Sequence, residues 1–534
     1  MLLAAAFPKI GMAGLAWVAP GCILFSAFGR KGGEAFRIGY VGGLAWALGS
    51  FYWLLFIPFP AGAITGWLAL SVYLGLYHAT WVWVSWRLLP VRVQTIPDFL
   101  GIPVFRRGLW GLSSAAVWVG LEMILARLFT GFPWNLMGAS QYQIVPLIQV
   151  ARVTGVYGVS FLVVWFSVAL ACACLNLTAN PAKSKAWVGD LLLPLVVLTG
   201  TLAFGFNQLI ELRPPERTLK AVLIQPSIPQ TLIWDTNQNA IRFSHLVDLS
   251  ERALEKTTNA QLLVWPEAAV PNMLRYDFDT YSAVTNLAFK HPVWVILGSD
   301  DAELRPNSKD READYFNSSF LVTPEGEIAA TYRKRCLVIF GEYIPLERWL
   351  PFMKYLTPVG GSFTRGPGPR PFIIPGLHAN ISVLICFEDI FPHVARGSVQ
   401  PDTDFLLNLT NNGWFGESAA QWQHAANAVF RAVENRIPLV RCTNNGLTCW
   451  IDACGAMHEV YFPNSKDIYG SGFKAVDVPL LDAGQKRPPT FYNQHGDCFG
   501  WTCLTVSCLM ALARRIWKSR SPSAGSDSTP EIPA

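Results

Sequence analysis

The chain has 534 residues, of which 51% are hydrophobic and 15% are charged, and its mean hydropathy is +0.30. Soluble domains contain about 25% charged residues, so this composition excludes a wholly soluble enzyme, a disordered protein and a disulfide-dense secreted module. The net charge of +5 is too small to indicate nucleic acid as a partner. Eleven cysteines without a CxxC pair and eight histidines without HExxH spacing argue against a metal site.

Seven apolar stretches approach the ~20 residues that a helix needs to span a membrane. They cover residues 10–28, 38–57, 61–86, 109–126, 156–177, 191–210 and 499–513. Buried helices of a large soluble core are the alternative, but six such stretches in the first 210 residues favour a membrane bundle. Glu122 lies inside the fourth stretch, where we expect structural pairing at the bundle surface rather than catalysis.

Basic residues predict the orientation of these spans, because short cytoplasmic loops are enriched in lysine and arginine. If the spans alternate in direction, every basic cluster falls on one side, which is then the cytoplasmic side. The clusters are Arg30, Lys31 and Arg37; Arg87, Arg92, Arg106 and Arg107; Lys183 and Lys185; and Arg514, Arg515, Lys518 and Arg520. The first span would then run inward from outside, so we expect that the N-terminus lies outside, or that another helix or a short re-entrant segment precedes this span.

This pattern divides the chain into four parts. We expect an N-terminal transmembrane bundle over 1–210, a periplasmic globular domain over 211–497, a last transmembrane helix over 498–515 and a disordered cytoplasmic tail over 516–534. In a bacterium, this places a multi-pass protein in the inner membrane.

The globular part alternates short apolar strands with helical patterns, which is typical of an α/β domain with buried central sheets. Strands are predicted at 219–225, 262–265, 293–299, 380–389, 404–410 and 438–443, helices at 239–256, 279–289 and 419–436, and hairpin turns at 323–327 and 453–457.

Three motifs place reactive side chains where strands end, which is where catalytic groups are commonly held. VWPEAAVP contains Glu267, TYRKRCLVIFGEYIP contains Lys334 and Glu342, and LICFED contains Cys386. Taken singly, a strand-end cysteine is more often a small core residue, and a lysine or glutamate is usually a solvated surface group.

Together, the order of these motifs resembles the carbon–nitrogen hydrolase (nitrilase) superfamily. The stretches at 130–143, 224–235, 332–347, 401–416 and 441–448 further resemble the apolipoprotein N-acyltransferase family. This resemblance implies an α-helical membrane bundle plus an αββα nitrilase-like sandwich inserted between the penultimate and last transmembrane helices. It implies no metal and no cofactor.

The resemblance also implies an enzyme that completes the acylation of bacterial lipoproteins. An acyl chain would pass from a membrane phospholipid to Cys386 as a thioester, and then to the free α-amine of a diacylglyceryl-cysteine apolipoprotein. Because an unperturbed thiol has a pKa of ~8.5, Glu267 would act as the general base. Lys334 would stabilise the oxyanion and, as a nearby ammonium, would favour the thiolate. We expect the protein to act as a monomer.

Supporting residues come from the same resemblance. Glu342 and Glu388 match family acids that support the triad, with an expected role in orienting Lys334 and shaping the pocket. Trp234, Asn317 and Trp414 lie in motifs near the active site and substrate loops, although a packed tryptophan or a capping asparagine would explain them as well. Phe387 occupies a position where relatives often have tyrosine.

Several alternatives remain open at this point. Residues 349–363 form either a mobile lid or a packed surface loop. One or two pairs among Cys336, Cys442, Cys449, Cys454 and Cys498 are compatible with an oxidising periplasm. Two other functions compete with acyl transfer: a membrane-anchored amidase that releases its acyl group to water, and a transporter or receptor with an inert nitrilase-like domain.

Overall fold

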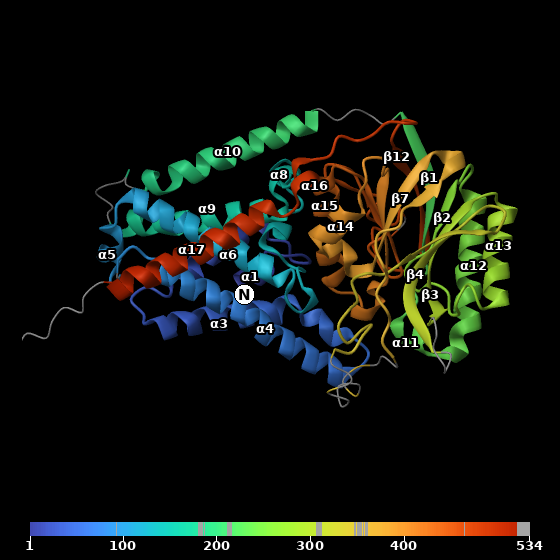
Figure 1. Cartoon of the computed structure of the whole chain (residues 1–534), viewed down its shortest axis with the longest axis horizontal. Coiled ribbons are helices and arrows are strands. Elements are labelled where there is room, and N and C mark those ends of the chain that lie inside the picture. Colours follow the sequence, from blue (N-terminus) through green and yellow to red (C-terminus); the bar gives the residue numbers. More distant parts are fainter. Residues whose placement is uncertain are drawn as a thin grey trace, which may run out of the picture.

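The computed structural model places a helical bundle at one end of the molecule, where the chain begins, and an α/β domain at the other (Figure 1). The structure describes residues 1–520 except 92, 180–184, 186, 211–215, 306–311, 346–348, 350–354, 356, 358–360 and 464. The chain leaves the bundle after α10 (Val188–Ile210), builds the α/β domain from β1 (Arg217–Gln225) onward, and returns through α17 (Cys498–Arg520).

The bundle combines long helices with short one-turn segments. The long helices are α3 (Gly32–Ser50), α4 (Pro60–Arg87), α6 (Val104–Leu125), α9 (Val156–Ala179), α10 and α17. The short elements are α1 (Leu2–Ala5), η1 (Ala13–Trp17), α2 (Ala19–Phe25), η2 (Tyr52–Phe56), α5 (Ile96–Leu100), η3 (Leu128–Thr130), η4 (Met137–Gln141), α7 (Val145–Ile148) and α8 (Ala151–Thr154).

Three described helices, α6, α9 and α10, are both long and apolar enough to cross a membrane. They correspond to the predicted spans at 109–126, 156–177 and 191–210. The prediction of one spanning helix at 10–28 is wrong, because this stretch forms η1 and α2, which are separated at Val18 with Pro20 in the first turn of α2. The stretch at 38–57 is likewise divided, since α3 ends at Ser50 and η2 follows.

Glu122 of α6 is buried inside the bundle, which corrects the prediction that it pairs at the bundle surface. Its carboxylate accepts hydrogen bonds from the Trp118 indole (2.9 Å) and from the backbone N–H of Met137 (2.7 Å). A buried acid needs such donors to offset its loss of hydration. Glu122 therefore joins α6 to η4.

The α/β domain contains two six-stranded sheets. The first has the order β12-β1-β2-β3-β4-β5, and the second has the order β11-β10-β9-β8-β7-β6. After β1, the strand bounds are β2 (Leu262–Val264), β3 (Trp294–Leu304), β4 (Ala313–Val322), β5 (Ile328–Arg333), β6 (Phe372–Ile374), β7 (Ala379–Ile385), β8 (Phe405–Thr410), β9 (Leu439–Thr443), β10 (Cys449–Ile451), β11 (Met457–His458) and β12 (Gly472–Leu480). Parallel pairs lie at the centre of both sheets.

Helices cover both outer faces, and this confirms the predicted αββα sandwich. On the first sheet lie α12 (Asn239–Lys256) and α13 (Phe278–Lys290), and on the second lie α14 (Pro392–Ser398) and α15 (Ala420–Asn435) (Figure 1). The remaining elements are α11 (Gln230–Trp234), η6 (Thr236–Gln238), η8 (Pro375–Leu377), η9 (Cys386–Ile390), η10 (Asn412–Phe415) and α16 (Phe491–His495). Alternate residues of the facing strands fill a core between the sheets, which includes Leu223, Val383 and Leu407.

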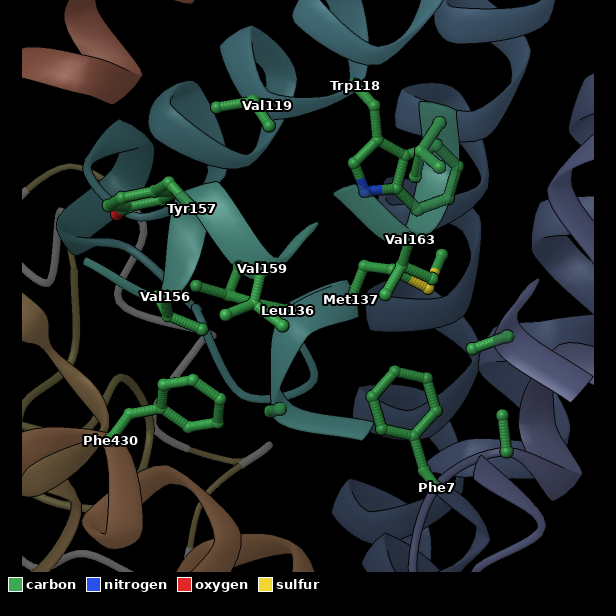
Figure 2. Packing of buried hydrophobic residues seen from close by; sticks show 14 of the residues in the cluster. Phe7, Trp118, Val119, Leu136, Met137, Val156, Tyr157, Val159, Val163 and Phe430 are labelled. Atoms are coloured by element: carbon green, nitrogen blue, oxygen red, sulfur yellow. The ribbon is translucent and has the colours of Figure 1, made fainter. Parts of the chain in front are cut away.

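Helix α15 lies between the second sheet and the bundle, and nearly all of its residues are buried. One hydrophobic cluster runs from the sheet through α15 into the bundle. Figure 2 shows Phe430 of α15 beside Val156 and Leu136, with Trp118 and Phe7 continuing the cluster. The two parts of the chain therefore share a core at their junction.

The eleven cysteines all lie in the part of the chain that the structure describes, and all are unpaired. The suggested disulfides among Cys336, Cys442, Cys449, Cys454 and Cys498 are therefore absent from this structure. Cys442 and Cys449 are buried within the strands, where a small thiol serves as an apolar core residue.

Candidate active site

Glu267 lies just after β2 and is 93% buried, with a fractional exposure of 7%. Its backbone packs closely against β3, because a Cβ on Gly298 would lie 2.7 Å from the Glu267 Cα. One carboxylate oxygen of Glu267 accepts a hydrogen bond from the backbone N–H of Asn411 (3.0 Å), which follows β8 in the second sheet. The side chain is thus fixed from both sheets.

Lys334 follows β5, and its ammonium is almost completely buried, with 1% exposure. The ammonium donates to Glu267 at 3.1 Å and to Glu342 at 2.7 Å. The side-chain amide of Asn317, on β4, donates to the same two carboxylates at 2.8 Å each. A cation and an amide therefore hold two acids together in a buried ion network.

Cys386 occupies the first position after β7 and begins η9. Its backbone is in the left-handed region, with φ of 54°, a conformation that costs free energy for a residue with a side chain. The side-chain amide of Asn408, on β8, donates to the Cys386 carbonyl at 2.8 Å. The charges of Glu267 and Lys334 both act on the thiol that this turn carries.

The pKa of the Cys386 thiol is raised, first by burial and then by the negative charge of Glu267, while Lys334 and the Thr410 hydroxyl lower it. The resting cysteine is therefore a thiol rather than a preformed thiolate, and the nearby ammonium does not outweigh burial. For Lys334, burial favours the neutral amine, but Glu267 and Glu342 raise its pKa well above the ordinary value. Burial raises the pKa of Glu342.

Asp300 on β3 adds a further acid near this network. Burial, together with the negative charges of Glu342 and Glu267, raises the pKa of Asp300 to about 6, although the charge of Lys334 opposes this shift. The site thus contains more acidic groups than cationic ones. This excess of acids favours the protonated form of the Cys386 thiol.

Glu388 is fully buried two residues after the cysteine. In the described structure its carboxylate accepts from the Tyr332 hydroxyl (2.8 Å) and from the backbone N–H groups of Arg335 (2.6 Å), Cys336 (3.0 Å) and Ile385 (2.9 Å). It contacts the segment after β5 rather than the Lys334 ammonium. Glu388 therefore ties the turn that carries Cys386 to the backbone next to Lys334.

A network of asparagines also surrounds the site, and the sequence analysis assigned no role to it. The Asn411 side chain donates to Gln230 (2.9 Å) and accepts from Asn444 (2.9 Å), and Asn444 exchanges hydrogen bonds with the Ile228 backbone. The sequence does contain a repeated motif for these asparagines, because TNNG occurs at 410–413 and again at 443–446. Sequence alone gave no reason to place these two segments side by side.

Aromatic residues border this network. Trp234 at the end of α11 and Trp414 in η10 form an edge-to-face pair with ring centroids 5.3 Å apart, and Trp234 is 40% exposed. The Phe387 ring centroid lies 5.7 Å from the Lys334 ammonium, so an apolar ring covers the cation. Most of the predicted lid at 349–363 falls outside the described residues.

Two family models match separate parts of the chain. Residues 1–169 match the apolipoprotein N-acyltransferase N-terminal domain, and residues 220–466 match the carbon–nitrogen hydrolase domain. A solved amidase of the nitrilase superfamily from Nesterenkonia AN1 aligns with 53% of this chain and 95% of its own, at 18% identity and a TM-score of 0.37.

Relatives named apolipoprotein N-acyltransferase match both parts of the chain. The protein from Geobacter metallireducens is 35% identical over 524 residues, covering 96% of this chain and 93% of the relative. The protein from Vibrio cholerae is 31% identical over 400 residues, covering 72% and 70%. This chain is thus a bacterial membrane acyltransferase of the nitrilase superfamily, and it belongs to the apolipoprotein N-acyltransferase family.

Proposed function

We propose that this protein transfers an acyl chain from a membrane phospholipid to the free α-amine of the N-terminal diacylglyceryl-cysteine of apolipoproteins. The observation that carries the proposal is the buried network of Glu267, Lys334 and Glu342, whose charges act on the Cys386 thiol. This arrangement provides a nucleophile, a proton acceptor and a fixed positive charge in a site sheltered from water.

In the first half-reaction, the Cys386 sulfur attacks the carbonyl carbon of a phospholipid ester while Glu267 takes the thiol proton. Two N–H bonds of the Lys334 ammonium are directed at carboxylates, and its third stabilises the negative oxygen of the tetrahedral intermediate. The carbon–oxygen bond then breaks, Glu267 returns the proton to the departing alkoxide, and a thioester and a lysophospholipid result.

In the second half-reaction, the α-amine of the diacylated apolipoprotein attacks the thioester carbonyl. Glu267 takes a proton from the attacking nitrogen, the carbon–sulfur bond breaks, and the sulfur regains a proton. The product is an amide and a free Cys386, which completes a ping-pong cycle. Both substrates are lipid-anchored, which accounts for joining a nitrilase-like domain to a membrane bundle.

The proposal places the protein in the bacterial inner membrane with the α/β domain in the periplasm. Support comes from the one-sided distribution of basic residues, including Arg30, Arg107 and Arg514. It also comes from the apolar exposed face of α10, which includes Leu192, Val196 and Phe206 and would face lipid.

To test this proposal, the purified full-length protein is incubated with phospholipid that carries a labelled acyl chain. We expect Cys386 to acquire the label as an adduct that neutral hydroxylamine cleaves, since a thioester reacts with hydroxylamine whereas an amide resists it. A diacylglyceryl-cysteine peptide should discharge the label and become triacylated, and the N-acetylated peptide should not. The Cys386→Ala variant should neither load nor transfer.

Two outcomes would contradict the proposal. Release of free fatty acid as fast as phospholipid is consumed, without an adduct on Cys386, would favour a hydrolase that uses water as the acceptor. Full acyl transfer by Cys386→Ala would exclude the covalent mechanism.

A further inference from the structure

A second buried network, separate from Glu267 and Lys334, holds the turn that carries Cys386. Asp389, three residues after the cysteine, is fully buried. One of its oxygens lies 2.6 Å from Nε2 of His424 on α15, and the other accepts from the Arg441 guanidinium on β9. Arg431 of α15 also donates to the Ile390 carbonyl at 2.9 Å. Side chains of helix α15 thus bind η9 directly.

His424 also contacts the segment that holds the proposed base. Its other ring nitrogen, Nδ1, lies 3.0 Å from the side-chain amide of Asn412. Asn412 directly follows Asn411, whose backbone N–H binds the Glu267 carboxylate. One imidazole, with 1% exposure, therefore bridges the turn bearing the nucleophile and the loop that fixes the base.

The bundle fixes the position of this imidazole. The Trp134 ring packs against the His424 ring with centroids 5.1 Å apart. The adjacent Gln423 accepts from the Trp53 indole (3.0 Å) and the Trp134 indole (3.1 Å), and it donates to the carbonyls of Pro8 (2.8 Å) and Ser50 (3.2 Å). His424 thus packs against the bundle residue Trp134 and contacts Asp389 and Asn412 of the active-site turns.

We propose that His424 is a positioning residue that sets the separation between the Cys386 thiol and the Glu267 carboxylate. It acts through Asp389 on the nucleophile and through Asn412 on the base. Proton transfer from the thiol requires hydrogen-bond geometry, so a small change in this bridge slows attack on the ester without altering lipid binding. The inference rests on the proposed function, because it requires Cys386 to be the nucleophile.

The test uses two amide substitutions that each retain one contact. His424→Gln places a nitrogen near the position of Nε2 and keeps the bond to Asp389, whereas His424→Asn places one near Nδ1 and keeps the contact with Asn412. The full-length variants are loaded with labelled phospholipid in a single turnover, and the rate of Cys386 acylation is expressed per folded molecule. The apparent KM for phospholipid and the thermal midpoint are measured in parallel.

We expect slower acylation in both variants, because each loses one of the two contacts that His424 makes with Asp389 and Asn412. His424→Asn should lose on the order of 10²-fold, the cost of about 1 Å of misplacement, and His424→Gln should lose less because it keeps the shorter contact. The KM should stay unchanged. The matched control is His245→Asn, since His245 is a half-buried residue on α12 that contacts Ser471, and it should load like the unmodified protein.

Acylation rates within twofold of the unmodified protein in both variants would overturn the inference. So would equal losses in both variants that follow the thermal midpoint, since these would indicate a purely structural role. Cys386→Ala in the same assay separates the two proposals. If that variant still transfers acyl chains, the proposed function fails, whereas if it is inactive and both His424 variants are fast, only the positioning role fails.

Discussion

The Cys386 thiol has a raised pKa, which favours its protonated form at rest. Burial and the charge of Glu267 raise the pKa of Cys386 more than Lys334 and Thr410 lower it. A protonated thiol is a much weaker nucleophile than a thiolate. In the proposed mechanism, the thiol loses its proton to Glu267 during the attack step.

Substituting this base should separate reactivity of the sulfur from acyl transfer. In Glu267→Gln the carboxylate charge that raises the pKa of Cys386 is lost, so the thiolate should form at lower pH than in the unmodified protein. Alkylation of Cys386 by a small uncharged electrophile, followed by mass spectrometry across pH, should show this downward shift. Acyl transfer should nevertheless fall by ~10²–10⁴-fold, because general-base catalysis is lost. An unchanged alkylation profile would mean that Glu267 does not face the thiol.

Removing the buried cation should impair the stabilisation of the oxyanion. Lys334→Met keeps a side chain of similar length but removes the ammonium, so acyl transfer should fall by at least ~10²–10³-fold, the effect of losing one oxyanion donor. Both the acylation of Cys386 and the transfer of the acyl chain to the amine should slow, since each step passes through a tetrahedral oxyanion. Lys334→Arg should not restore activity, because a planar guanidinium does not replace a compact ammonium between two carboxylates. Near-normal rates in Lys334→Met would remove Lys334 from the mechanism.

Among the secondary-structure elements, the central strands determine where the reactive groups meet. Glu267, Lys334 and Cys386 follow β2, β5 and β7, which belong to two different sheets. Face-to-face packing of the sheets brings these strand ends together, and the backbone of Asn411, after β8, crosses from the second sheet to bind Glu267. The site is therefore a property of the sandwich rather than of either sheet.

The close approach of β3 to Glu267 gives a test of this packing. A Cβ at Gly298 would lie 2.6 Å from the Pro266 carbonyl oxygen and 2.7 Å from the Glu267 Cα, so Gly298→Ala must displace the base. We expect activity to fall and stability to drop by about 1–3 kcal/mol, as for other overpacked sites. Gly397→Ala is the control, because no atom lies within 4 Å of its added Cβ, and it should leave activity unchanged without lowering the thermal midpoint. Full activity in Gly298→Ala would contradict the requirement for this contact.

The arrangement of bundle and α/β domain explains why α15 is buried on all sides. One face packs on the second sheet, and the other packs on bundle residues such as Val156 and Leu136. The hydrogen bonds of Gln423 with Trp53 and Trp134 reinforce this junction. The α/β domain is therefore completed by the bundle, in contrast to a soluble domain attached through a flexible linker.

Membrane orientation is tested with reporters fused to the full chain. Because basic clusters mark the cytoplasmic side, a reporter that is active only outside the cytoplasm should work after Lys220 or at Asp482. A reporter that is active only in the cytoplasm should work after Arg520. Reversed activities would contradict the periplasmic location and, with it, a role in acylating exported lipoproteins.

The amino-acid sequence alone determined the division into an apolar bundle and an α/β domain, because hydropathy and strand–helix alternation are local properties. It also indicated the residues Glu267, Lys334 and Cys386, whose motifs end apolar strands. These predictions needed only short stretches of chain, and the αββα class followed from the resemblance that the motifs carry.

Only the tertiary structure decided which distant groups touch. Hydropathy is the same whether a helix faces lipid or protein, so it could not reveal that the stretch at 10–28 is broken, that Glu122 is buried, or that α15 is enclosed by the bundle. The contacts of Asn411 with Glu267 and of His424 with Asp389 join segments from different elements. Such contacts depend on how sheets and helices pack, and no local pattern in the sequence encodes that packing.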